Sequence, residues 1–142
     1  MKNLILVIVA SAFISLNVNA QTNKNVPTSV KTAFSQKFAN ATDVKWGKEG
    51  KTEWEAEFKL NGKPYSANYD LKGVWLETEY AINASEIPAA VKASIDKKYA
   101  GYKVKVSEIS ETKKGKLYEF ELVKGKTKVE AAFDINGKII KK

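Results

Sequence analysis

The sequence has 142 residues with 24 basic and 16 acidic side chains, a net charge of +8, and neither cysteine nor histidine. This composition excludes catalysis by a cysteine or by a serine–histidine pair, and it removes the commonest ligands of zinc and haem. All basic residues are lysine, whereas nucleic-acid recognition usually relies on arginine and basic aromatic motifs. We therefore expect no cofactor and no nucleic-acid partner.

The N-terminal segment 1–20 is typical of a signal peptide. Lys2 precedes an apolar run that ends at Leu16, and small or tolerated residues stand before a cleavage point between Ala20 and Gln21. The run is shorter than the roughly 20 apolar residues that an uncleaved membrane anchor needs, and a lipoprotein anchor would need a cysteine. Cleavage lowers the net charge to +7 because Lys2 is lost. We expect a periplasmic or secreted protein without a stable membrane anchor.

The polar residues 21–25 are interpreted as a flexible leader, and residues 26–142 as one domain made of two repeats. Val26-Pro27 is followed by apolar residues at the same spacing as those that follow Ile87-Pro88. The pattern around Trp54 also recurs around Tyr118, at nearly the same offset along the chain. Self-similarity of this kind predicts two copies of one structural unit. Their expected bounds are about 26–80 and 87–142.

Each repeat is predicted to open with a helix, near residues 27–39 and 88–99, because apolar residues lie four apart after a proline. The apolar period then falls to two, which indicates strands. Asn61-Gly62 favours a two-residue turn with positive φ at both positions. That turn sets Phe58 opposite Tyr65. Gly125-Lys126 is predicted to close the matching hairpin.

Two further turns are predicted where Asp70 and Asp134 each stand three positions before a glycine, as type I turns prefer. Strands are expected after these turns, over 74–80 and 138–141. Weaker strands are expected before the two hairpins, over 43–48 and 104–110. The predicted fold class is α+β, with a helix and then an antiparallel meander, twice over. Helices would cover the apolar face of the sheet, and the opposite face, rich in Glu, Lys and Asn, would stay exposed to water.

The chain resembles the beta-lactamase-inhibitor-like, PepSY-like domains of secreted bacterial proteins, which are common in the Bacteroidetes group. The residues that carry the resemblance are VPTSVKTAFSQKFANATDVKW (26–46), TEWEAEF (52–58), SANYDLKGVWLETE (66–79) and, more faintly, IPAAVKASIDKKYAGYKV (87–104). The resemblance implies helices packed on an antiparallel sheet, and action by binding, as in proteins that block a beta-lactamase or in modules of peptidase propeptides. It brings no catalytic residue and no inhibitory loop.

Carboxylates occur in pairs at alternate positions, so that each pair projects from one face of its strand. The pairs are Glu55 with Glu57, Glu77 with Glu79, and Glu119 with Glu121. Such pairs suit the acid and nucleophile of a glycosidase or a calcium site. They equally suit an outward strand face balanced by lysines, which strand alternation alone produces. We favour the second interpretation.

The candidate partner-binding patch consists of Trp75, Glu77 and Glu79, which share strand parity. Exposed aromatic side chains flanked by charge are common anchors of interfaces. A bulge at Gly73 would shift the parity of Trp75 and place it elsewhere. Trp54, by contrast, shares parity with Ala56 and Phe58 and is expected in the core.

These features predict a binding module rather than an enzyme. The expected partner is a protein of the cell envelope, with inhibition or modulation of a peptidase or another envelope enzyme as one mode of action. The alternative is a carrier of a small ligand or glycan that uses the aromatic sheet surface. A pocket lined by Tyr65, Tyr69, Trp75 and Tyr80 would favour the carrier.

Overall fold

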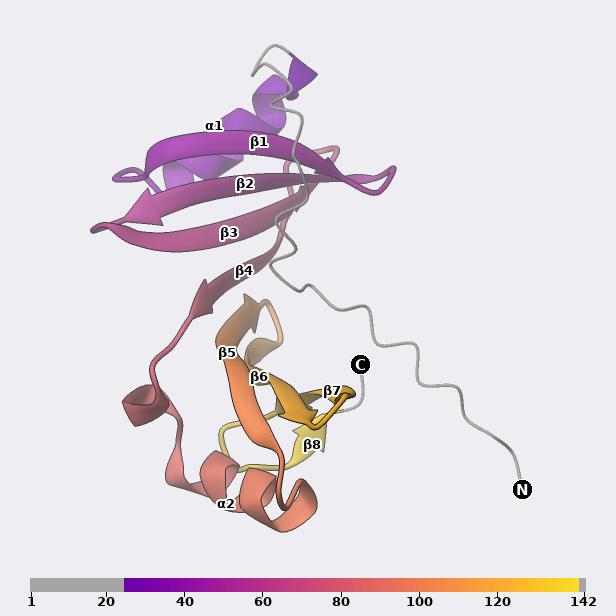
Figure 1. Cartoon of the computed structure of the whole chain (residues 1–142). Coiled ribbons are helices and arrows are strands. Elements are labelled where there is room, and N and C mark those ends of the chain that lie inside the picture. The colour runs from indigo at the N-terminus through magenta and orange to yellow at the C-terminus, as the bar shows by residue number, and fades with distance from the viewer. Residues whose placement is uncertain (1–24, 141–142) are drawn as a thin grey trace.

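The computed structural model of the protein describes residues 25–140. The predicted signal peptide, its cleavage site at Ala20 and Gln21, and residues 21–24 lie outside the described residues. Two helices and eight strands follow one another in the order predicted by the sequence (Figure 1). Their bounds are α1 Thr28–Lys37, β1 Thr42–Glu49, β2 Glu53–Leu60, β3 Lys63–Asp70, β4 Trp75–Ala81, α2 Ala89–Lys98, β5 Lys103–Thr112, β6 Gly115–Lys124, β7 Thr127–Phe133 and β8 Ile139–Ile140, with a short 3-10 helix η2 at Ala84–Glu86.

All eight strands form one antiparallel sheet in chain order, so the α+β class is confirmed. The connection from β4 to β5 carries η2 and α2, and the two strands still pair directly, with Glu79 opposite Ser110. In Figure 1, α1 lies beside β1 to β3 at one end of the molecule and α2 lies beside β5 to β8 at the other. The directions of β1 to β3 and of β5 differ widely in this view, because adjacent strands of a sheet are twisted relative to one another.

Both predicted hairpin registers are confirmed. Asn61 and Gly62 have φ of 50° and 80°, as a two-residue turn with two positive φ values requires. Phe58 therefore pairs with Tyr65, and Trp54 pairs with Tyr69. In the second hairpin the loop is Gly125-Lys126, between the paired residues Lys124 and Thr127. Short turns fix the register because a slip by one residue would exchange the two faces of the strand.

Each of the two predicted aspartate turns lies just before the last strand of its meander and contacts a helix. The carboxylate of Asp70 accepts hydrogen bonds from the backbone N–H groups of Lys72 and Val74, each at 2.8 Å. Asp134 does the same for Asn136 and Lys138, each at 2.9 Å. Glycine ends each turn where no side chain would fit: a Cβ on Gly73 would lie 2.6 Å from the carbonyl oxygen of Ser29 in α1.

The core consists of two clusters on the helix-covered face, one beneath each helix. The first is aromatic: the ring of Phe34 on α1 makes edge contacts with Phe58 and Trp46, with centroids 5.0 and 5.2 Å apart. The second is mainly aliphatic and contains Val91 and Ile95 of α2. Aromatic side chains bury large apolar areas, which makes the first cluster a major source of stability.

Candidate functional site

The face of the sheet opposite the helices carries all three predicted carboxylate pairs. Glu55 and Glu57 alternate with the buried Trp54, Ala56 and Phe58, so they point away from α1. The strand registers then continue this face across the sheet. We call it the acidic face and define it by Glu55, Glu57, Ser66, Asn68, Glu77, Glu79, Glu108, Ser110, Glu119 and Glu121.

A continuous row of cross-strand partners shows how the pairs come together. Glu57 lies opposite Ser66, Ser66 opposite Glu79, and Glu79 opposite Ser110. Two positions before Ser110 on β5, Glu108 lies opposite Glu119 of β6. Directly opposed residues have their Cβ atoms about 5 Å apart, so each carboxylate has a close neighbour on the adjacent strand.

The expectation that this whole face stays exposed to water is wrong at its centre. Glu79 and Glu108 are only 8% exposed, and Ser66 and Ser110 are 2% and 1% exposed. These residues lie on β3, β4 and β5, which have strands on both sides, so neighbouring side chains cover them. Strand alternation predicted the direction of Glu79 and Ser66 but not how closely they pack.

Burial and mutual repulsion raise the pKa of two carboxyl groups on this face to about 7. For Glu55 the main cause is burial, and the charges of Glu49 and Glu57 add to it. For Glu108 burial again comes first, followed by the charges of Glu119 and Glu121. An ordinary glutamate is fully ionised at neutral pH. These two are partly protonated there, which shows that the fold does not favour their ionised form.

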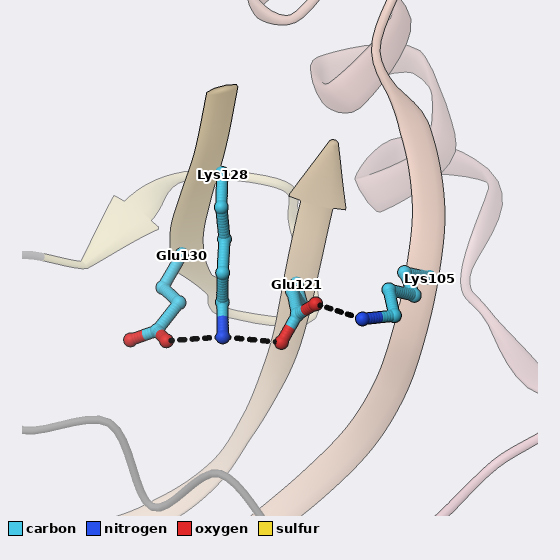
Figure 2. A network of polar contacts seen from close by, with 4 residues as sticks. All are labelled: Lys105, Glu121, Lys128 and Glu130. Atoms are coloured by element: carbon cyan, nitrogen blue, oxygen red, sulfur yellow. Dashed lines mark ion pairs between the residues drawn. The ribbon is translucent and has the colours of Figure 1, made fainter. Parts of the chain in front are cut away.

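At one end of the acidic face, lysines balance the charge. Figure 2 shows Glu121 between Lys105 and Lys128, with Nζ to Oε distances of 3.1 and 2.6 Å. Lys128 also contacts Glu130 at 3.7 Å. The hydrogen bonds from Lys128 and Lys105 hold the pKa of Glu121 below its usual range. This arrangement is the lysine-balanced strand face that the sequence predicts.

The remaining carboxylates of the face differ. Within residues 25–140, the ion pairs formed by lysine involve Asp43, Glu111, Glu121 and Glu130, and none involves Glu55, Glu57, Glu77 or Glu108. Glu77 accepts a hydrogen bond from the hydroxyl of Ser110, a neutral donor. These four carboxyl groups therefore have no lysine partner within residues 25–140.

The structure separates the predicted patch of Trp75, Glu77 and Glu79. Asn68 pairs with Glu77 whereas Tyr69 pairs with Trp75, so a bulge at Leu76 inverts the parity between them. Glu77 and Glu79 lie on the acidic face, while Trp75 packs against the core cluster under α1. The sequence left open a partly exposed Trp75 or a bulge at Gly73; Trp75 is half-buried, and the bulge lies at Leu76.

Trp75 is held on the helix-covered face by polar contacts as well. Its indole N–H donates to Thr78 Oγ1 at 2.9 Å, and Lys37 of α1 lies over the ring with Nζ 3.8 Å from the centroid. The other aromatic residues of the predicted pocket also pack on neighbours: Tyr65 contacts Tyr80 with centroids 4.9 Å apart, and Tyr69 is fully buried. These are packing contacts within the core and between its two clusters.

Sequence reasoning placed Ser66 on this face but missed Glu108 and Ser110. Their parity was readable from the strand pattern, but the pairing of β4 with β5 was not, because the connection 82–102 separates the two strands. Within the described range 25–140, no group of three or more acidic side chains has a geometry that could hold a metal ion. No helix in that range is long and apolar enough to cross a membrane.

Comparison with known proteins places the fold. A family model described as "Putative beta-lactamase-inhibitor-like, PepSY-like" matches residues 52–141, which include all strands of the acidic face. No curated protein matches the sequence.

Solved structures with the same fold come from Bacteroides. A BLIP-like protein of Bacteroides fragilis aligns with a TM-score of 0.71 and 23% identity, over 80% of this chain and 82% of that one. A DUF2874 family protein of Bacteroides uniformis gives 0.74 and 23%, over 80% and 86%. A structure from Bacteroides eggerthii described as "putative periplasmic proteins" gives 0.74 and 18%, over 81% and 86%. With the family match over most of its length, the chain belongs to the beta-lactamase-inhibitor-like, PepSY-like family.

Proposed function

We propose that this protein is an exported, non-catalytic binding module that recognises a protein of the cell envelope through its acidic face. The observation that carries the proposal is the contrast between the two faces of one sheet. One face is filled by core residues beneath two helices, and the other buries carboxylates such as Glu108 without a lysine partner in residues 25–140. A buried, unpaired charge destabilises a fold, and a bound partner that supplies an opposite charge would offset that cost.

The signal sequence supports export. Residues 1–20 fit the three-part pattern of a cleaved signal peptide, and a solved structure of the same fold is described as periplasmic. A cell-envelope partner follows from that location. Inhibition of an envelope enzyme is one form that such binding takes, and the description of the family as beta-lactamase-inhibitor-like is in keeping with it.

The absence of catalysis is part of the proposal. The chain has no histidine or cysteine, so the acidic face would act through its carboxylates. Those carboxylates are spread over β2, β4, β5 and β6 of one sheet face, which suits contact with a macromolecule. The carrier alternative has less support, because Tyr69, Trp75 and Tyr80 pack against neighbouring side chains.

We also propose that the two halves of the chain are copies of one structural unit. Each half has a helix that follows a proline, four strands, and an aspartate turn whose glycine touches that helix. Gly73 meets the backbone of Ser29, and Gly137 meets that of Ala90. Gly73 and Gly137 are 64 residues apart, and Ser29 and Ala90 are 61 apart. The strand and helix patterns of the sequence recur at these same two distances, so the same contact is built from matching positions.

Affinity capture from envelope extract, with the exported protein as bait, tests the proposed function. We expect the protein captured by the wild type to be lost when Glu57 and Glu77 are changed together to Gln. Asp96→Asn, on the exposed side of α2, removes the same kind of charge away from the face and should leave capture unchanged. Capture that survives the double change on the acidic face would contradict the proposal.

A further inference from the structure

We infer that the acidic face binds a lysine- or arginine-bearing, extended segment of its protein partner, and that Glu108 lies at the centre of this site. The inference rests on the proposed function, since it gives the chemistry of the partner at the same surface. Three observations support it: the burial of Glu108 without a cationic partner, the distribution of lysines over the chain, and the spacing of the carboxylates along the strands.

Glu108 is a buried acid without a partner in the described chain. It is 8% exposed, and within residues 25–140 it receives no hydrogen bond from a side chain and no lysine contact. Its cross-strand neighbour is Glu119, and Glu121 is also near enough to repel it. A carboxylate that is desolvated among like charges gains most from an added cation, because the low local dielectric strengthens the attraction.

The distribution of lysines points to an external cation. The chain has 24 lysines, and Lys105 and Lys128 show that lysines can reach this sheet face, since both pair with Glu121 (Figure 2). In residues 25–140 no lysine pairs with Glu55, Glu57, Glu77 or Glu108 in the same way. The face is therefore negative at its centre on a chain that is positive overall, which steers a basic partner toward it.

The spacing of the carboxylates suits an extended chain. Alternate residues of a strand lie about 6.7 Å apart and project from the same face. Glu55 with Glu57, and Glu77 with Glu79, follow this spacing on β2 and β4. Basic side chains at alternate positions of an extended segment repeat at the same distance. Such a segment lying along the strands would place successive cations over successive carboxylates.

A direct binding experiment uses a labelled short peptide that alternates lysine with threonine, and a control peptide with glutamate in place of lysine. We expect the exported protein to bind the lysine peptide in fluorescence anisotropy, and to bind the glutamate peptide at least about tenfold more weakly. Glu108→Gln should weaken binding of the lysine peptide about fivefold or more, and Asp96→Asn should change it less than about twofold. Circular dichroism verifies that each variant is folded.

Several results would overturn the inference. Equal binding of both peptides, or unchanged binding by Glu108→Gln, would show that the site does not select cations. Competition by spermidine as strong as by the peptide would assign the site to a small polyamine. A dimer in sedimentation that Glu108→Gln dissolves would assign it to a second copy of the lysine-rich chain.

The capture experiment separates this inference from the proposed function. If the captured partner is lost on changing Glu57 and Glu77, and the lysine peptide also displaces it from the wild type, both stand. If the partner depends on the face but the peptide neither binds nor displaces it, the function stands and the basic-segment inference fails. If the partner is indifferent to the face, the proposed function fails.

Discussion

The two faces of the sheet bury side chains with opposite consequences. On the helix-covered face, Trp54 is 2% exposed and packs among aromatic rings, and removing such apolar area from water stabilises the fold. On the acidic face, Glu108 is nearly as buried but lies among like charges, which costs free energy. The comparison separates two contributions within one sheet: burial on one face stabilises the domain, whereas burial of carboxylates on the other lowers its stability.

The largest expected effect comes from truncating aromatic side chains on the helix-covered face. Trp54→Ala or Phe58→Ala should lower the free energy of unfolding by about 3–5 kcal/mol, because each removes a large side chain from a packed core. The matched change on the opposite face of the same strand, Glu55→Gln with Glu57→Gln, should leave the free energy of unfolding within about 1 kcal/mol of the wild-type value, because burial already disfavours the ionised form of Glu55. Urea unfolding at neutral pH measures both. Equal losses from the two faces would refute the face assignment of β2.

A pair of glycines tests the contact between α1 and the turn that joins β3 to β4. Gly73 and Gly62 both have positive φ, 87° and 80°, but only Gly73 faces a backbone, with its Cβ position 2.6 Å from the Ser29 oxygen. Gly62→Ala should cost about 1 kcal/mol from strain alone. Gly73→Ala should cost about 2–4 kcal/mol, because α1 must also shift. Similar unfolding midpoints for the two variants would mean that the turn does not press on α1.

The raised pKa values on the acidic face predict how the stability of the protein depends on pH. The folded pKa of Glu55 and of Glu108 is about 7, above the ordinary value of 4.5, and burial is the main cause for each. The fold therefore favours the protonated forms. Their contribution to stability is full below about pH 4.5 and is lost as the pH rises through about 7.

Between about pH 8 and pH 5, the wild type should therefore gain stability, by about 1 kcal/mol for each of the two groups after solvent screening is allowed for. Below that window, groups with lowered pKa values such as Glu121 and Asp43 act in the opposite direction. Thermal unfolding at a series of pH values measures the trend. A midpoint that rises steadily from pH 5 to pH 8 would contradict the assignment of the two carboxyl groups.

The smallest effect concerns Lys37, which links α1 to the bulged end of β4. Its ammonium lies 3.8 Å from the centroid of the Trp75 ring. Lys37→Met keeps the aliphatic stem and removes the charge, and should cost about 0.5–1 kcal/mol. Lys92→Met on the exposed side of α2 is the matched control. Indistinguishable losses would show that the cation–π contact adds no stability.

Local chemistry made the hairpins predictable from the sequence. Asn61 and Gly62 define a turn with one register, and Asp70 and Asp134 each build a turn from their own carboxylate. The bulge at Leu76 was not located, because its position depends on how β3 and β4 pair around the docking of Trp75 on α1. The acidic face could not be predicted either, because it depends on pairing between strands that are far apart in the sequence.

The acidic face shows the same limit. Parity predicted that Glu55, Glu57, Glu77 and Glu79 project in pairs, but only the pairing of β4 with β5 brings them into one face with Glu108. No local signal specifies that pairing, since α2 and its flanking loops intervene. The low exposure of Glu108 follows from the same long-range arrangement and was equally hidden.

The proposed binding role of the acidic face implies that its buried carboxylates lower the stability of the fold. The most direct measurement is urea unfolding of Glu108→Gln at about pH 8, where the wild-type carboxyl is mostly ionised, combined with its affinity for the lysine peptide. We expect a variant that is more stable than the wild type and binds the peptide more weakly. A variant that is less stable and binds as before would show that Glu108 stabilises the fold, and would contradict the proposed binding role.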